Sequence, residues 1–286
     1  NATTNCFSAI ATTTDTYIGQ NFTGKLDETK VYDYARTPAQ IAWEYNQGAP
    51  IAWYKLDECQ GTTAYNSAKN GNGDAAGNNG TITIGATGSN TSAGTCAGSA
   101  GQAWFDGATG KIGSSLEFDG TNDYVEINSL LGTPTNISIS AWVNIQAIDT
   151  TSAEIVNIGN YVDLRGFQSG YGGFQCNYYK GGAAWNTIAN GGTPNYTGTG
   201  WHHVACVIDD VANVQNLFVD GKIVFTGSYT ESIVWSGLQS TTLLGKHPTS
   251  GSFDFNGQLD DVRIFNYALT SAQVNDVYNN GAVSFK

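Results

Sequence analysis

The chain contains two copies of one segment. Residues 24–48 align without a gap to residues 257–281, at a constant offset (257 − 24 = 233 and 281 − 48 = 233). A repeating unit of this length is the size of a domain. We therefore predict that residues 1–48 are the C-terminal strands and helix of a preceding unit, and that residues 49–286 form one complete domain.

Each copy is predicted to form a strand followed by a helix. Thr270 and Gln273 have the spacing of a capping box at a helix N-terminus, and Thr37 and Gln40 repeat it. We expect the helix from Thr37 to Gln47 to dock on the following domain. The strand pattern places Asp260, Val262 and Ile264 on one face, and Leu259, Asp261, Arg263 and Phe265 on the other.

The composition favours an all-β protein and excludes some partners. Charged residues make up 13% of the chain and there are 36 glycines, as in chains of short strands and turns. The net charge of −12 argues against nucleic acid or an anionic membrane, because an acidic surface repels phosphates. No run of about 18 apolar residues occurs, so we expect no membrane insertion. Since residue 1 is Asn rather than Met, we expect the chain to be cut from a longer protein.

A series of short strands is predicted after residue 50. Every second residue of 137–145 is apolar, which is typical of a strand with one buried face, and Asp220-Gly221 predicts a hairpin turn. The Gly- and Asn-rich segment 68–98 is expected to be a surface loop that carries little of the core. Further strands are expected at 51–56, 115–118, 124–127, 155–164, 173–179, 202–208, 216–219 and 222–225, and from 243 onward.

The five cysteines predict an oxidising, extracytoplasmic location. Cys59 and Cys96 flank the Gly/Asn-rich segment, and we predict a disulfide between them. Cys176 and Cys206 lie in predicted strands, where they either pair with each other or serve as small buried apolar residues. Cys6 has no assigned partner.

Six motifs resemble, in their order along the chain, those of a known family. They lie at residues 52–58, 115–127, 139–143, 201–205, 218–222 and 257–265. Together they resemble a LamG-like (laminin G domain-like) jelly roll of the concanavalin A-like lectin/glucanase superfamily, in a tandem array like those of bacterial surface proteins. The resemblance implies a two-sheet antiparallel jelly-roll β-sandwich with a short C-terminal helix. It does not fix the ligand, because this fold hosts lectins, adhesins, glycanases and spacers.

One tight turn brings together oxygens of the kind that bind calcium. Members of the resembled family often hold Ca²⁺ near this loop, with acids from the terminal strands nearby. The alternative is that the carboxylates accept backbone N–H groups and that the turn is ordinary turn chemistry. The predicted ligands of a structural Ca²⁺ ion are Asp119, Asn122 and Asp123 in the turn, with Glu58 and Asp260 or its neighbour Asp261.

Aromatic residues gather between residues 171 and 185. A sugar site needs an aromatic face for the pyranose ring, with amides and carboxylates for its hydroxyls, although each aromatic is alternatively a core residue. The predicted ligand-binding residues are Tyr171, Tyr178, Tyr179 and Trp185, with Gln168, Asn177 and Asn186 as polar neighbours.

We predict no catalytic residues. Glycanases need two carboxylates a few ångströms apart, whereas the adjacent acids Asp57-Glu58 and Asp260-Asp261 point to opposite faces of a strand. His202 and His203 precede an apolar run without assignable acids, so we expect them to be structural.

The expected function is therefore that of a non-catalytic module at the cell surface. Its ligand would be a glycan or a cell-surface protein, its role adhesion, and its neighbours other LamG-like units. The alternatives are a structural spacer repeat and, thirdly, a glycoside hydrolase.

The calcium prediction is tested by titrating chelator-treated protein with Ca²⁺ in a calorimeter. We expect binding heat and a higher melting temperature, because a ligand that binds the folded state stabilises it by about 2.7 kcal/mol at 100 times its dissociation constant. Asp119→Asn, which removes a charged ligand, should weaken both effects. A titration without heat and without a melting shift contradicts the prediction.

Overall fold

A computed structural model divides the chain into two compact units, residues 1–36 and residues 37–286. It describes residues 17–36, 40, 41, 44, 48–69, 77–128, 130, 132–147, 153–166, 173–189, 195–238, 240–249 and 253–279. Cys6, Gln168, Tyr171 and most of the helix predicted from Thr37 to Gln47 lie outside these residues.

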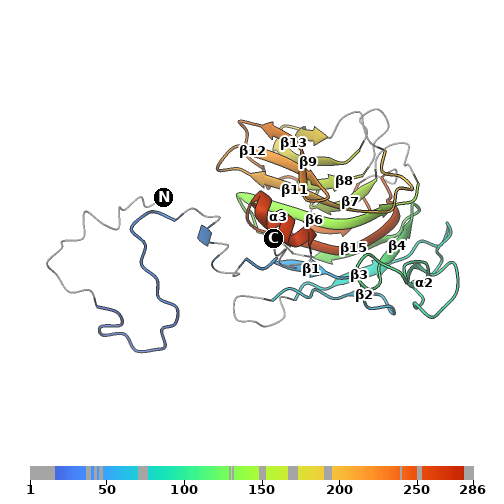
Figure 1. Cartoon of the computed structure of the whole chain (residues 1–286), viewed down its shortest axis with the longest axis horizontal. Helices are drawn as coiled ribbons and strands as arrows, with labels where there is room; N and C mark the ends of the chain where they lie inside the picture. The colour runs from blue at the N-terminus through green and yellow to red at the C-terminus, as the bar shows by residue number, and fades with distance from the viewer. Residues whose placement is uncertain are drawn as a thin grey trace, which may run out of the picture. The chain divides into compact units, whose positions relative to one another are not determined.

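The described strands of the second unit form two antiparallel sheets that pack face to face (Figure 1). The seven-stranded sheet has the order β1-β15-β6-β11-β12-β13, with β4 also paired to β15. Its strands are β1 (Ala52–Tyr54), β4 (Leu116–Asp119), β6 (Asn136–Ile145), β11 (Trp201–Asp209), β12 (Val214–Val219), β13 (Lys222–Ser228) and β15 (Asn256–Phe265).

The eight-stranded sheet has the order β10-β9-β8-β7-β14-β5-β3-β2. Its strands are β2 (Thr63–Ala64), β3 (Gly80–Thr83), β5 (Tyr124–Asn128), β7 (Glu154–Ile158), β8 (Val162–Arg165), β9 (Gln175–Gly181), β10 (Ala184–Ala189) and β14 (Thr241–Leu244). The antiparallel jelly-roll sandwich expected from the sequence is confirmed.

Side-chain alternation fills the space between the sheets. On β6, Ile137, Ile139, Ala141 and Val143 enter the main hydrophobic core, while Trp142 points to the opposite face. This period of two is what a strand with one face on the core requires. The short helix α2 (Ala103–Asp106) adds the buried indole of Trp104 to the same core.

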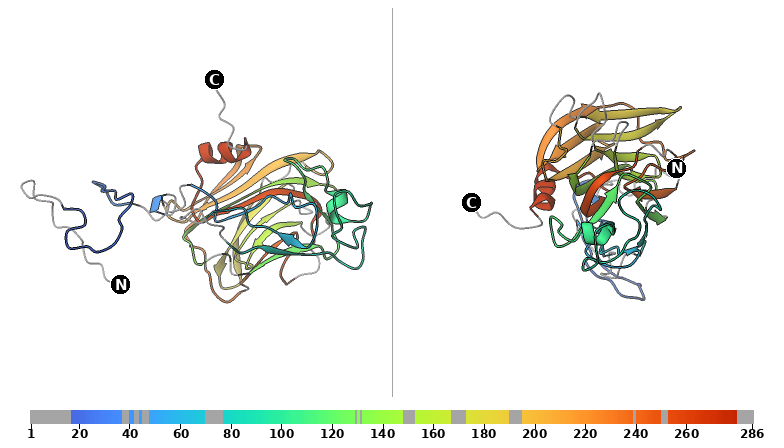
Figure 2. Two further views of the ribbon diagram at one scale, coloured as in Figure 1. Left: turned by 90° about the horizontal axis from the view of Figure 1, so that it is seen from below. Right: turned by 90° about the vertical axis from the view of Figure 1, so that its right-hand side faces the viewer.

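A second apolar cluster lies outside the sandwich, beneath helix α3 (Ser271–Tyr278). Figure 2 shows α3 lying on the outer side of the sandwich. The predicted capping box is present: Gln273 N donates to Thr270 Oγ1 at 3.3 Å, and Thr270 N donates to Gln273 Oε1 at 2.8 Å. The cluster comprises Ala205, Val207, Phe218, Phe265, Tyr267, Leu269, Val274 and Val277.

The alternation predicted for β15 is wrong in its first half, because the strand contains a bulge. The step from Asp260 to Arg263 on β15 opposes the step from Trp142 to Ser140 on β6, so β15 carries one extra residue. Asp261 adopts a φ of 50° there. The residues that share the core face are consequently Leu259, Val262 and Ile264, and Asp260 faces away from them.

Two further expectations are corrected. The segment 68–98 is more than a surface loop, because it supplies β3, which pairs with β2 and β5 and buries Ile82 in the core. The strand expected over 155–164 is a hairpin of β7 and β8, whose turn residues Gly159 and Asn160 have φ values of 60° and 58°.

Two disulfides occur in the described part of the chain. Cys59–Cys96 is the predicted bridge. Cys176 on β9 pairs with Cys206 on β11, with a Cα–Cα distance of 5.4 Å, so this second bridge joins the two sheets through the core. Disulfides persist in oxidising compartments, which supports a secreted protein.

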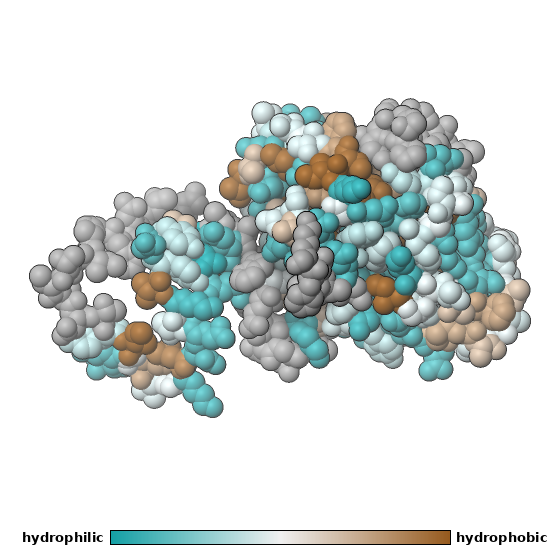
Figure 3. Space-filling model, in the orientation of Figure 1, coloured by the Kyte–Doolittle hydropathy of each residue, from teal (hydrophilic) through white to brown (hydrophobic). Residues whose placement is uncertain are grey.

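Several exposed hydrophobic side chains gather in each of two regions, where Figure 3 shows brown patches. One is the edge strand β13, where Ile223, Val224 and Phe225 are exposed. The other is the segment 17–36, which exposes Ile18, Phe22, Leu26, Val31 and Tyr34. Within the described residues, no helix is long and apolar enough to cross a membrane.

Removal of the inter-sheet disulfide should destabilise the sandwich. Its loop spans 30 residues, for which the chain-entropy model gives about 3.6 kcal/mol. We expect Cys176→Ala with Cys206→Ala to lower the free energy of unfolding by about that amount in urea denaturation. The double variant at Cys59 and Cys96 is the matched control, since it opens a loop of similar length at the periphery. An unchanged denaturation midpoint in the Cys176/Cys206 variant would contradict the assigned bridge.

Candidate functional site

The outer face of β7, β8 and β9 carries polar side chains that are buried. On β8, Val162 and Leu164 enter the core, so Asp163 and Arg165 point outward. Asp163 is fully buried, although it lies on the side of the sheet away from the core. Buried polar groups of this kind need partners.

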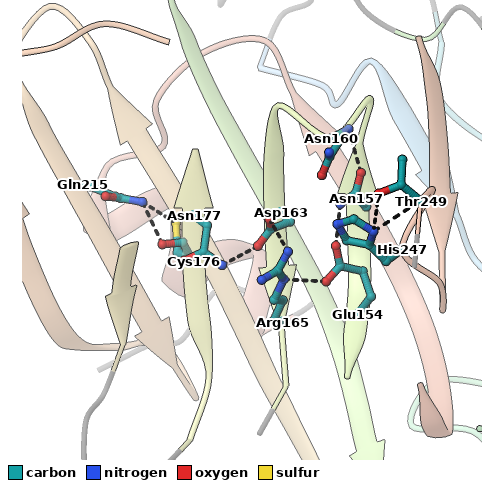
Figure 4. A network of polar contacts seen from close by, with 10 residues as sticks. All are labelled: Glu154, Asn157, Asn160, Asp163, Arg165, Cys176, Asn177, Gln215, His247 and Thr249. Atoms are coloured by element: carbon teal, nitrogen blue, oxygen red, sulfur yellow. Dashed lines mark hydrogen bonds and ion pairs between the residues drawn. The ribbon is translucent and has the colours of Figure 1, made fainter. Parts of the chain in front are cut away.

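A network of hydrogen bonds and ion pairs satisfies these groups (Figure 4). Arg165 Nε donates to Glu154 Oε2 at 2.6 Å, and Arg165 Nη2 lies 3.1 Å from Asp163 Oδ2. Asn157 donates to Glu154 from the β7 side, and Asn177 donates to Asp163 from β9. Three strands are thereby tied together by their outward side chains.

The network holds two carboxylates and one guanidinium, and hence excess negative charge. Burial, then the charge of Asp163, raises the pKa of Glu154, although Arg165 acts in the opposite direction. Burial also raises the pKa of Asp163. His247, which follows β14, has its pKa lowered to about 4 by burial and by Arg165. The site therefore favours extra protons on its acids and a neutral imidazole.

Aromatic rings continue the same face of the sheet toward β10. The rings of Tyr179 and Trp185 are 5.5 Å apart and inclined by 59°. Tyr179 is also 6.4 Å from Tyr161, whose ring lies 5.5 Å from Trp235. Tyr179 and Trp185 are each half-buried, so their faces remain partly open to solvent. The hydroxyl oxygen of Tyr179 accepts the backbone N–H of Ala183, which fixes its ring.

Strand alternation separates the predicted sugar-binding residues into two groups. Tyr179 and Trp185 share the outer face with Asn177, whereas Tyr178 is fully buried in the core and donates its hydroxyl to Glu231 O. Asn186 also points inward, where it donates to Gln215 Oε1 at 3.0 Å. Tyr178 and Asn186 therefore point away from the face that carries Tyr179 and Trp185.

The combination of rings and amides suits a ligand with many hydroxyls. An aromatic face packs against the apolar side of a sugar ring, and nearby amide and carboxylate oxygens accept from its hydroxyls. Asn177 Oδ1 has no hydrogen-bond partner within the described residues, although it is buried.

The predicted calcium turn is satisfied by backbone N–H groups. Asp119 accepts from Asn90 N at 2.7 Å and from Thr121 N at 2.8 Å. Asp123 accepts from Gly85 N at 2.8 Å and from Asp119 N at 3.1 Å, and burial raises its pKa to about 6. Asn122 Oδ1 accepts from Lys246 Nζ at 2.9 Å, so an ammonium group sits beside the turn.

The other predicted metal ligands have different partners. Glu58 Oε1 accepts from Tyr65 N at 2.7 Å, and Asp260 Oδ2 accepts from Ile112 N at 2.7 Å. In the described part of the chain, no three His, Cys, Asp or Glu side chains gather closely enough to hold a metal. These contacts do not form a calcium cage by themselves, and Ca²⁺ binding stays a prediction of the sequence.

The two histidines of the sequence Trp201-His202-His203 are held by structural contacts. His202 Nδ1 lies 2.8 Å from Asp220 Oδ2, next to the predicted Asp-Gly turn. His203 is buried against Trp142 on the outer face of the seven-stranded sheet, and burial lowers its pKa to about 3.

The acid–guanidinium network was missed by the sequence reasoning, although part of its signal was present. Gly159-Asn160 is a hairpin signal between apolar runs. A hairpin at that point places Asp163 and Arg165 opposite Glu154 and Asn157. The prediction of a single strand over residues 155–164 does not place these four residues opposite one another.

Known proteins resemble this chain in the sequence pattern of a family and in fold. The family model for the concanavalin A-like lectin/glucanases superfamily matches residues 119–275, more than half of the 286 residues. No curated protein sequence matches the chain.

Solved structures show the same fold at low identity. Domain 4 of a GH43 extracellular arabinanase from Geobacillus stearothermophilus, in complex with arabinotriose, matches with a TM-score of 0.54 and 21% identity, over 80% of this chain and 98% of that domain. The binding domain of Paraclostridial Mosquitocidal Protein 1 matches with a TM-score of 0.56 and 12% identity, over 81% of this chain.

A botulinum neurotoxin serotype D/C binding domain matches with a TM-score of 0.55 and 12% identity, over 83% of this chain and 53% of that chain. This chain likewise covers 52% of the mosquitocidal binding domain, so it spans about half the length of these toxin domains. Two of these three structures are binding domains, and the third holds arabinotriose. Given the match of the family model over more than half of its length, the chain belongs to the concanavalin A-like lectin/glucanase superfamily.

Proposed function

We propose that this protein is a non-catalytic extracellular module that binds a neutral glycan on the outer face of β8, β9 and β10. The observation that carries the proposal is the half-buried pair of aromatic rings, Tyr179 and Trp185, on the outer face of β9 and β10. The arabinanase domain of the same fold, in complex with arabinotriose, supports a sugar ligand.

The charge of the face selects the class of glycan. The guanidinium of Arg165 is engaged by both Glu154 and Asp163. A uronic acid or a sulfated sugar would therefore find no free cation in this network. The ring of a neutral sugar needs no cation and can stack on Trp185.

The network also argues against glycoside hydrolysis. A glycosidase needs one carboxyl group as acid and another as nucleophile or base, both reaching the scissile bond. Here both carboxylates are fully buried and paired with Arg165. We therefore expect no release of reducing sugar from polysaccharides.

A role in adhesion at the cell surface follows from this binding activity. A glycan-binding module in a secreted protein holds that protein on a glycan-coated surface, and a bound Ca²⁺ ion would stabilise the module. A spacer repeat is the competing reading, and it differs by binding no glycan reproducibly.

Glycan binding is expected to depend on the aromatic pair. Trp185→Ala and Tyr179→Ala should each weaken binding of a neutral oligosaccharide about two- to tenfold, since stacking on an aromatic face contributes about 0.5–1.5 kcal/mol. A glycan array identifies the probe, with arabinotriose included, and calorimetry measures the affinity.

The matched control is Tyr65→Ala, which removes an exposed aromatic ring near β2, 57% exposed and on no part of the proposed site. Equal loss of binding in this variant, or no reproducible binding by the unmodified protein, would contradict the proposal and favour a structural spacer repeat.

The excess charge of the network predicts a pH dependence of stability. The pKa of Glu154 is raised in the folded state. Glu154 therefore contributes fully to the free energy of unfolding below its ordinary pKa, and this contribution is lost as the pH rises through the raised pKa. The lowered pKa of His247 acts only below pH 6.5, with the opposite sign. We expect the free energy of unfolding to fall by about 1 kcal/mol between pH 6.5 and 8.

Glu154→Gln should reduce that fall by the contribution of Glu154. Glu117 and Asp260, whose pKa values burial raises to about 7, should retain the rest of it. Glu126→Gln, on β5 of the same sheet, is the control and should retain it. Urea denaturation at several pH values measures the slope. A slope that is unchanged in Glu154→Gln contradicts the assignment.

A further inference from the structure

The segment 24–36 adopts the backbone conformation of the bulged strand β15. Gly24 and Gly257 have φ values of 158° and 150°, and Glu28 and Asp261 have φ values of 44° and 50°. Each pair is separated by the repeat offset (257 − 24 = 233 and 261 − 28 = 233). A φ near +50° is uncommon for a residue other than glycine, so its recurrence at the matching position is specific.

Side-chain contacts repeat at the same positions. Lys30 Nζ lies 3.4 Å from Glu28 Oε2, as Arg263 Nη2 lies 2.8 Å from Asp261 Oδ2. The rings of Tyr32 and Tyr34 meet edge to face at 5.6 Å, and those of Phe265 and Tyr267 do so at the same distance. The segment thus carries the ion pair and the aromatic pair of β15 as well as its backbone shape.

The surroundings differ between the two copies. In β15, Leu259, Val262 and Ile264 are fully buried, and the strand lies between β6 on one side and β1 with β4 on the other. In the first copy, the matching Leu26 and Val31 are 53% and 74% exposed. The same apolar pattern is covered in one copy and open to solvent in the other.

We propose that residues 24–36 form the final strand of another sandwich of this fold. The partner is a unit that supplies strands equivalent to β1, β4 and β6 and leaves the position of β15 empty. In the predicted register, Leu26, Thr29 and Val31 enter the partner's core where Leu259, Val262 and Ile264 enter this one. The bulge at Glu28 then turns the side chain of Asp27 away from the partner's core, just as the bulge at Asp261 turns the side chain of Asp260 away from the core of this domain.

Close packing against β6 requires glycine at the start of this strand. A Cβ on Gly257 would come within 2.2 Å of Asn144 O on β6, so the strand that fills this position needs glycine there. Gly24 meets the requirement. Tyr267 also donates its hydroxyl to Gly48 O at 2.8 Å, at the entry to the domain. Tyr34 is expected to bind the corresponding carbonyl of the partner.

The proposal is tested by adding a sandwich that lacks its last strand. Residues 49–256 are fused directly to residues 24–286, so that Gly24 follows residue 256 as Gly257 does. We expect amide hydrogen exchange across residues 24–32 to slow at least about 100-fold relative to the original chain, and to reach the protection of β15. Exchange that stays as fast as in the original chain overturns the proposal.

Three further proteins make the result specific. In a fusion of residues 49–286 to residues 17–286, the added unit keeps its own β15, and residues 24–32 should stay unprotected. In the first fusion, Leu26→Asp should unfold the added sandwich and leave the melting of the original one unchanged. Asp33→Asn places at position 33 the residue found at position 266. It should change neither the protection of residues 24–32 nor the folding of the added sandwich. Protection that survives Leu26→Asp overturns the proposed register.

Discussion

The bulge at Asp261 sets the architecture of the seven-stranded sheet. Asp261 is 4% exposed, and its carboxylate accepts from the indole N–H of Trp53 and pairs with Arg263. These contacts hold a positive φ that costs free energy for a residue other than glycine. Because of the extra residue, Leu259 and Val262 can both face the core. Without the extra residue, the apolar side chains at one end of β15 would point away from the core, although β15 stays paired with β4 and β6.

The candidate site depends on that core from the other side of the sandwich. Cys176 is bridged to Cys206 inside the core, and the alternation of β9 then turns the next residue, Asn177, outward. Asn177 and Arg165 meet at Asp163, which joins the amide of β9 to the ion pairs of β8. Breaking one partner of a buried ion pair costs about 3–5 kcal/mol, so the network holds β7, β8 and β9 in register.

Sequence periodicity predicted the elements whose geometry is regular. The strand β6, the turn at Asp220-Gly221 and the capping box of α3 all follow from local patterns, and the structure has each of them. The bulge could not be read in this way, because an alternating pattern does not show where one residue is inserted. For the site, Tyr179 and Trp185 were found by composition, but alternation was needed to remove Tyr178. The partners of Arg165 come from two strands, and they become visible only when the hairpin is placed.

The repeated bulge indicates how much of the strand's shape is local. Glu28 and Asp261 have the same conformation and the same ion pair two residues on, although Asp261 is buried and Glu28 lies in an exposed segment. A strand that already has its bound shape loses less conformational entropy on docking. If units linked through such strands each carry the proposed aromatic face, weak stacking at each face would add through effective concentration rather than through new contacts. Strand docking and glycan binding, which use opposite sheets of the sandwich, are thereby compatible in one small domain.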